Sequence, residues 1–277
     1  MCVWCELYGD SYERWYLNPA NYARRLYKIR REEAEAVWTK DAPRPPGGST
    51  VSREFIEACD RGDHETVERI KREEEQRALV GHFGQVVTLE DALKVVDIMY
   101  PIVLMTCECR RLMYGTPDEE NFFCMGMGSG MYKWERWPDE YRGGVHFLTS
   151  EEAKEVLIKM NKRGMVHGVF VFGTPYIAGL CSCDYPDCDA IRARVDYDFK
   201  VYWKGHHAAH LHPELCNGCG NCVARCQFKA INLVPSRNKV YIDQMQCFGC
   251  GNCTSVCDQE AITLLERAGL PALANQW

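Results

Sequence analysis

The chain has 277 residues, of which 46% are hydrophobic, enough for one large domain or two modest ones. Its 39 acidic residues outnumber its 33 basic ones, the net charge is −6, and no long Lys/Arg stripe occurs, which argues against a nucleic-acid partner. No apolar run approaches the ~20 residues that span a bilayer, and the N-terminus lacks an export signal, so we predict a cytoplasmic protein without a membrane span.

The first 49 residues predict a helical extension and a linker. Asn18 can cap a helix over 19–38 with Pro19 in its first turn, and the Pro- and Gly-rich segment 41–49 is typical of a linker.

Residues 50–205 predict a small mixed α/β domain that carries cysteines. The expected helices cover 52–59, 63–79, 88–100 and 151–163, and the expected strands cover 102–106, 166–172 and 176–180. Residues 115–145 are rich in loop-forming residues. Ser150 is the expected cap of the last helix, and Gly164 occupies its expected left-handed end.

The third segment, 206–277, contains an internal duplication. The spacing C-x2-C-x2-C-x3-C begins at Cys216 and again at Cys247, a period of 31 residues. Both runs resemble the bacterial-type 2[4Fe-4S] ferredoxins. In most of those proteins proline follows the last cysteine, whereas Gln227 and Asp258 follow it here. Proline fixes φ and removes an N–H but supplies no ligand, so we expect altered local hydrogen bonding and two intact clusters. The predicted fold class is α+β, with the mixed domain followed by a duplicated, β-α-β-like ferredoxin domain.

The resemblance implies two crossed ligand sets, because in duplicated ferredoxins the fourth cysteine of each run binds the other cluster. The first [4Fe-4S] cluster is assigned to Cys216, Cys219, Cys222 and Cys257. The second is assigned to Cys247, Cys250, Cys253 and Cys226. Zinc is the alternative occupant, but this tandem spacing is rare among zinc sites.

Nine cysteines lie outside the two runs, and clustered thiols in a reducing compartment are usually metal ligands. We expect a third [4Fe-4S] cluster, or else a structural zinc ion, held by some of Cys107, Cys109, Cys124, Cys181, Cys183 and Cys188. Cys124 is expected on a loop. If Cys2 and Cys5 join them, the eight thiols suffice for two further sites. Cys59 stands alone on a predicted helix and is expected to be a small buried residue.

A wider resemblance covers residues 100–265. The motifs are Cys-x-Cys-Arg at 107–110, Cys124, Thr-Ser-Glu-Glu-Ala at 149–153, Gly-Met-Val-His at 164–167, and the cysteine group at 181–188. Their order resembles a family of uncharacterised 4Fe-4S binding proteins of anaerobes. That resemblance implies a cluster-binding N-terminal domain and assigns no reaction.

The histidines give weaker signals. His206 and His210 are four residues apart and could share a helical face and a metal or haem, although a polar connector is the simpler interpretation. His167 lies in an apolar strand and is expected to be a core histidine. The Gly-Met-Gly-Ser-Gly segment at 126–130 does not match a dinucleotide-binding motif.

The motifs favour an iron–sulfur electron-transfer protein, or a subunit of an oxidoreductase, that relays low-potential electrons to a redox partner. The alternative is a reductase whose own active site, an open cluster, flavin or corrinoid, lies in 50–205. A redox or oxygen sensor is a third interpretation.

Overall fold

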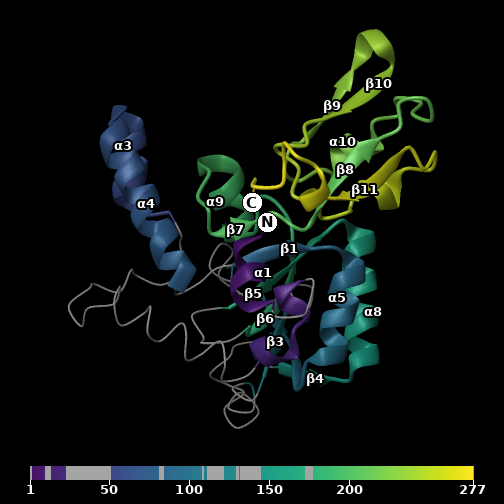
Figure 1. Ribbon diagram of the computed structural model, residues 1–277. Coiled ribbons are helices and arrows are strands. Elements are labelled where there is room, and N and C mark those ends of the chain that lie inside the picture. The colour runs from purple at the N-terminus through teal and green to yellow at the C-terminus, as the bar shows by residue number, and fades with distance from the viewer. Residues whose placement is uncertain are drawn as a thin grey trace.

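The computed structural model describes residues 2–9, 14–22, 51–80, 84–107, 109–110, 122–128, 131, 145–171 and 177–276. The chain has an α+β fold, with a seven-stranded mixed sheet followed by two small two-stranded sheets (Figure 1). The helices are α1 (Val3–Tyr8), α3 (Arg53–Arg61), α4 (His64–Val80), α5 (Leu89–Ile98), α8 (Ser150–Arg163), α9 (Asp189–Tyr197) and α10 (Asn221–Arg225). Short 3-10 helices cover Trp15–Leu17, Pro19–Tyr22, Pro235–Arg237, Thr254–Val256 and Arg267–Gly269. The rest of the predicted helix 19–38, and the linker 41–49, lie outside the described residues.

Seven strands form one sheet in the order β4-β2-β3-β6-β5-β1-β7. They are β1 (Gly84–Val87), β2 (Ile102–Thr106), β3 (Phe122–Met127), β4 (Val145–Leu148), β5 (Val166–Phe170), β6 (Gly179–Cys183) and β7 (Tyr202–Trp203). All neighbouring strands run antiparallel except β1 and β7. The end of β2, the start of β3 and the end of β6 therefore lie side by side at the same edge of the sheet, the one formed by strand ends.

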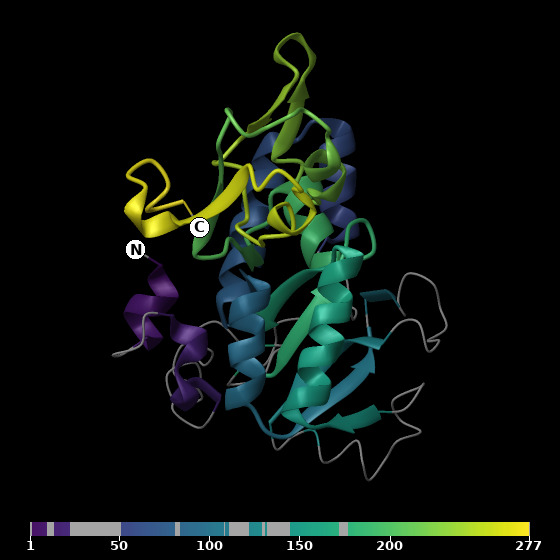
Figure 2. The same ribbon diagram turned by 90° about the vertical axis from the view of Figure 1, so that its right-hand side faces the viewer.

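Helices α5 and α8 lie side by side against one face of the sheet (Figure 2). Their ends follow the predicted signals with one correction. Thr149, rather than Ser150, caps α8, because its side chain accepts a hydrogen bond from the backbone of Glu152 while that carboxylate accepts one from the backbone of Thr149. Gly164 ends α8 at φ 91°, the left-handed conformation that glycine adopts without strain.

One strand lies where the sequence predicted loops. β3 falls within 115–145, β4 begins at the last residue of that segment, and β3 is a central strand with β2 and β6 on its two sides. The expectation that Cys124 lies on a loop is therefore wrong. Residues 123–127 of β3 are all buried. The segment therefore lacks the alternation of buried and exposed side chains by which a half-buried strand is recognised in a sequence. β1 and α9 were also not anticipated.

The C-terminal part contains β8 (His207–Leu211), which pairs with β11 (Ile262–Glu266), and the hairpin of β9 (Ile231–Val234) with β10 (Lys239–Ile242). His206 and His210 thus do not share a helical face; the second lies within β8. The C-terminal part stacks on the end of the sheet where α9 and β7 lie (Figure 1).

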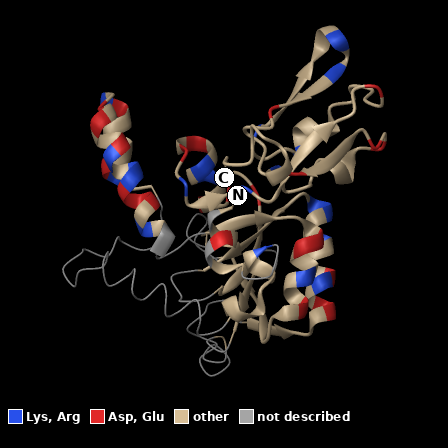
Figure 3. Ribbon diagram, in the orientation of Figure 1, with Lys and Arg blue, Asp and Glu red and all other residues tan. Residues whose placement is uncertain are grey.

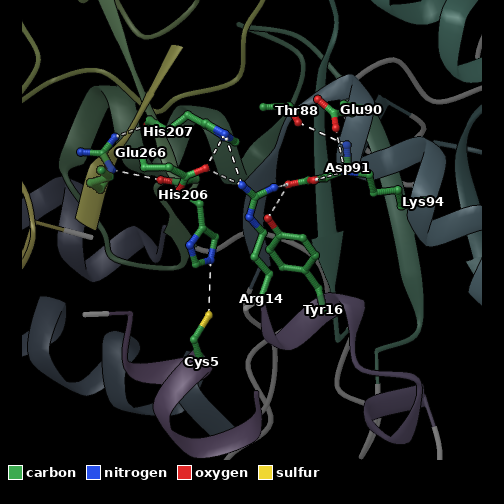
Figure 4. A network of polar contacts seen from close by, with 12 residues as sticks. Cys5, Arg14, Tyr16, Thr88, Glu90, Asp91, Lys94, His206, His207 and Glu266 are labelled. Atoms are coloured by element: carbon green, nitrogen blue, oxygen red, sulfur yellow. Dashed lines mark hydrogen bonds and ion pairs between the residues drawn. The ribbon is translucent and has the colours of Figure 1, made fainter. Parts of the chain in front are cut away.

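Arg14 connects the N-terminal segment both to a helix packed on the large sheet and to a strand of the C-terminal part (Figure 4). Its guanidinium pairs with Asp91 on α5, and donates to Glu266 on β11 at 2.7 Å. Asp91 also accepts a 2.8 Å hydrogen bond from the hydroxyl of Tyr16. Asp91 is only 1% exposed, so this carboxylate depends on its partners for its stability.

Both signs of charge are mixed along α3, α4, α5 and α8 (Figure 3). Exposed pairs one helical turn apart, such as Arg69 with Glu73 and Lys94 with Glu90, are typical of solvated helix faces. None of the helices in the described ranges is long and apolar enough to cross a membrane.

Candidate iron–sulfur centres

Two hollows in the C-terminal part are each lined by cysteines from both runs. The first has about 260 Å³ of empty space and is lined by Cys216, Cys219, Cys222 and Cys257. The second has about 360 Å³ and is lined by Cys226, Cys247, Cys250 and Cys253. Each hollow combines the first three cysteines of one run with the last cysteine of the other, the same grouping that the sequence predicts.

The duplication extends to the backbone around the hollows. Gly218 and Gly249 both have φ 72°, and Lys229 and Glu260, also 31 residues apart, have φ 56° and 49°. A Cβ atom at Gly249 would collide with the carbonyl oxygen of His207. Glycine is therefore required there both for its backbone conformation and for the close approach of β8.

Backbone N–H groups point at the cysteine sulfurs in the same way in both halves. The Ala230 N–H donates to Cys226 Sγ and the Ala261 N–H donates to Cys257 Sγ, each at 3.3 Å. Cys247 Sγ accepts from the N–H of Gly249 at 3.4 Å. Such bonds disperse the charge of an iron-bound thiolate and thereby tune the reduction potential of a cluster.

Burial makes the metal-free thiols reluctant to ionise. It raises the pKa of Cys250 to about 12 against an opposing hydrogen bond from the backbone of Asn252, and it raises the pKa of Cys222 to about 11 together with the neighbouring Cys219 thiolate. Since metal ligands must be thiolates, cluster insertion here has to expel protons.

The upstream cysteines converge at the sheet edge described above. Cys107 follows β2, Cys124 lies on β3 directly opposite Cys181 on β6, and the Sγ atoms of this pair are 3.7 Å apart. Cys183 ends β6 and Cys188 precedes α9. These residues and Cys109, which we call the six-thiol group, thus come together although they span 107–188.

Four members of this group form a closed ring. In this ring Cys107 and Cys188 each lie close enough to Cys109 and to Cys183 to influence the pKa of both thiols. Cys124 contacts Cys107 from outside the ring and links it to Cys181. The pKa of Cys109 is raised to about 12. Its interaction with Cys107 is the largest cause and burial acts in the same direction, whereas its interaction with Cys188 opposes both.

The spacing of these thiols can be compared with what a single metal ion requires. On a tetrahedral zinc ion every pair of ligand atoms lies only about 3.5–4 Å apart. Among the described residues, no three members of the six-thiol group lie within 4.8 Å of one another. As they stand, the six thiols therefore show no set of three ligands as compact as a single tetrahedral ion requires.

The second hollow lies against the six-thiol group. Gln227 replaces the usual proline, and its side chain accepts from the N–H of Tyr185 at 2.6 Å and donates to the carbonyl oxygen of Gly164 at 2.5 Å. Asn252, 1% exposed, donates to the carbonyl oxygens of Gly164 and Met165 at 2.8 and 3.1 Å. Tyr185 lies between Cys183 and Cys188, so the Gln227 amide joins the two cysteine-rich regions directly.

Aromatic rings fill the space between the two regions. Phe228 and Phe248 stack with ring centroids 3.9 Å apart, and they belong to the same apolar cluster as Cys107, Cys183 and Cys188. Tyr202 lies between the regions as well: burial, then the thiolates of both, raise the pKa of its hydroxyl well above the ordinary value. No sequence motif indicates this position of Tyr202 between the two regions.

The remaining predicted residues lie elsewhere. Cys2 and Cys5, at the start of α1, lie beside His206, which is in the segment between β7 and β8. The expectation that Cys59 is buried is wrong: it is exposed on α3. His167 is 1% exposed and its Nδ1 lies 2.8 Å from Ser182 Oγ, as expected for a core histidine, and burial lowers its pKa to about 4.

Comparison with known proteins agrees with the C-terminal geometry. Residues 200–261 match the family model of the 4Fe-4S dicluster domain. No curated protein matches the chain. The C-terminal part is therefore a metal-binding iron–sulfur domain of the dicluster type, and this domain with its cysteines points to iron–sulfur electron transfer.

Proposed function

We propose that the chain is an electron-transfer protein, or an electron-transfer subunit of an oxidoreductase, with three [4Fe-4S] clusters in a row. Cluster one is bound by the four cysteines of the first hollow and cluster two by those of the second hollow. Cluster three is bound within the six-thiol group, with Cys107, Cys109, Cys183 and Cys188 as its ligands.

The observation that carries this proposal is the continuity of the apolar packing. Cysteines from both hollows share one apolar cluster, and Cys226 and Cys250 of the second hollow also pack against the cluster that contains the ring thiols. Cluster two thus lies between the other two centres. A row of adjacent centres needs no substrate chemistry in order to pass single electrons between partners.

Buried cations accompany cluster two. Arg267 is fully buried and donates to the carbonyl oxygens of Cys247, His207 and Gly205 at 2.6, 2.9 and 3.0 Å. A fixed positive charge behind a cluster ligand favours the reduced, more negative cluster, and so raises its reduction potential relative to a cluster without one. We infer that cluster two is the easier of the two ferredoxin clusters to reduce.

Cluster one is the one nearest to a partner protein. Cys219 is exposed, unlike the cysteines of the second hollow. Leu215 (49% exposed) and the exposed Tyr241 of β10 supply apolar surface on the same part of the chain. A redox partner that docks there would reach cluster one first, and the electrons would then pass through cluster two to cluster three.

The test is to purify the protein without oxygen and to count iron and acid-labile sulfide. We expect ~12 iron atoms per chain, whereas ~8 would contradict cluster three. Cys183→Ser should remove about four iron atoms and leave the ferredoxin clusters in place. The matched control is Cys59→Ser, which changes an exposed thiol and should leave the iron count unaltered. Stoichiometric flavin or corrinoid in the same sample would instead support the reductase alternative.

A further inference from the structure

A set of metal-ligating side chains lies apart from the three proposed clusters. The Sγ atoms of Cys2 and Cys5 and a ring nitrogen of His206 all lie within 4.8 Å of one another. Cys5 Sγ is 3.4 Å from Nε2 of His206, the contact drawn in Figure 4. Two residues of the set are buried: Cys2 is 3% and His206 7% exposed.

Local structure holds these ligands in place. Cys2 precedes α1 and Cys5 lies in its first turn, with the Cys5 N–H donating to the carbonyl oxygen of Cys2 at 3.0 Å. This turn directs both thiols to the same side. His206 is fixed by its own carbonyl oxygen, which accepts a 2.7 Å hydrogen bond from the N–H of the buried Arg267.

A buried amide orients one of the thiols. Gln85 of β1 is 0% exposed, and its Nε2 donates to Cys2 Sγ at 3.7 Å and to the carbonyl oxygen of Lys204 at 2.9 Å. Its Oε1 accepts from the indole N–H of Trp15 at 2.6 Å. A donor held from both sides and aimed at a sulfur is the kind of outer contact that orients metal ligands and stabilises a thiolate.

We propose that Cys2, Cys5 and His206 bind one Zn²⁺ ion, with a water molecule in the fourth position. Two thiolates and an imidazole are ordinary zinc ligands. Ligands at about 2.3 and 2.0–2.1 Å on a tetrahedral ion lie about 3.5 Å apart, which agrees with the 3.4 Å between Cys5 and His206.

Spacing and burial argue against the two other uses of a Cys-x2-Cys pair. Thiolates of a [4Fe-4S] cluster bind different irons and stand farther apart than these ligands. A dithiol that exchanges with a protein substrate needs an accessible attacking sulfur, whereas Cys2 is buried and Cys5 is half-buried.

The ion would fasten the N-terminal segment beside cluster two. His206 follows Gly205, whose N–H donates to the carbonyl oxygen of Phe248 at 2.8 Å, within the cysteine run of the second hollow. The zinc site therefore joins α1 to the turn that supports this hollow. The proposal does not depend on the electron-transfer proposal, because its ligands belong to none of the three clusters.

The first test uses the unaltered holoprotein, purified without oxygen from zinc-supplemented cells. We expect one zinc per chain in addition to the iron. Zinc K-edge absorption should find two sulfur ligands at about 2.3 Å and two nitrogen or oxygen ligands at about 2.0–2.1 Å. Absence of zinc, or a shell of four sulfurs, which would locate zinc among the other cysteines, would overturn the proposal. So would a Cys2–Cys5 disulfide in the anaerobic protein.

Variants provide the second test. Cys5→Ser and His206→Ala should each lower bound zinc at least about tenfold while the iron count stays unchanged. The matched controls are Cys59→Ser, an exposed thiol, and His210→Ala, a histidine of β8; both should keep their zinc. Retention of a full zinc ion in Cys5→Ser and in His206→Ala would refute the assignment. If neither variant folds, the ligand shell of the unaltered protein still decides the question.

Discussion

Gln227→Ala should loosen the contact between cluster two and the six-thiol group without removing a ligand. The substitution deletes the hydrogen bonds to the N–H of Tyr185 and to the carbonyl oxygen of Gly164. Each such bond contributes roughly 0.5–1.5 kcal/mol net, so the pair contributes roughly 1–3 kcal/mol. The matched control is Asp258→Ala, since Asp258 occupies the same place in the second run but is exposed.

Amide hydrogen exchange on the anaerobic holoprotein measures this effect. The Tyr185 N–H itself is uninformative, because it loses its acceptor in the variant. The Cys188 N–H is the better reporter: it donates to the carbonyl oxygen of Asp184 at 2.9 Å, a bond within the same loop that the substitution leaves intact. A loss of roughly 1–3 kcal/mol in opening free energy predicts roughly 5- to 150-fold faster exchange there.

Two results would refute this reasoning. Unchanged exchange at Cys188 in Gln227→Ala would mean that the side chain does not hold the loop. Equal acceleration in Asp258→Ala would mean that the effect arises within the dicluster domain rather than at the contact. The iron count should stay the same in both variants, and loss of iron from Gln227→Ala would point to a role for Gln227 in holding cluster two itself.

Three further substitutions test other parts of the structure. Gly249→Ala forces a Cβ atom into the backbone of β8 and should cost about four iron atoms per chain in an iron analysis. Gly220 also has a positive φ, but a Cβ atom there meets no neighbour, so the Gly220→Ala control should keep its iron. Arg14→Met leaves the buried Asp91 with only the more distant, half-exposed Lys94 at 3.8 Å, and should lower the free energy of unfolding by about 3–5 kcal/mol. Arg69→Met, which breaks an exposed pair, should cost under ~1 kcal/mol in the same anaerobic denaturant titration, and equal losses would contradict the prediction. His167 is buried with its pKa lowered from 6.5 to about 4, so the unfolded chain binds the proton more tightly than the folded one. The free energy of unfolding should therefore be at its full value above pH ~6.5 and fall by up to about 3 kcal/mol towards pH 4. A His167→Gln variant that lost the same free energy over that window would refute this account.

The dicluster domain could be anticipated because its information is local. Three ligands of each hollow come from one tight run, and the 31-residue period repeats the glycines as well as the cysteines. What the sequence could not indicate is why proline is missing after Cys226. The reason lies in a contact with Tyr185, 42 residues away along the chain, which no local pattern encodes.

The sequence predicts which six cysteines form the six-thiol group, but not how the strands arrange them. Cys-x-Cys pairs at strand ends suggested a shared site, and β2 and β6 do bring them together. β3 was missed because its residues are buried on both sides, so it shows neither the period of a half-buried strand nor a flanking turn signal. Cys59 was misjudged for a related reason: an isolated cysteine on a helix says nothing about which side of the helix faces the core.

The site that we propose for zinc and the first hollow thus differ in the spacing of their ligands rather than in their sequence motif. Cys2-x2-Cys5 and Cys216-x2-Cys219 have the same spacing in the sequence, yet only the first pair has a histidine nitrogen at 3.4 Å, a separation that suits one ion. The second pair lines a hollow with two further cysteines and has no such compact arrangement among the described residues. Because a single tetrahedral ion demands close ligands and a cube demands separated ones, the zinc site that we propose and the iron–sulfur clusters should take up their metals without exchanging places. Zinc analysis of a Cys219→Ser variant tests this division: loss of iron with retention of the zinc ion is expected, and loss of both together would contradict it.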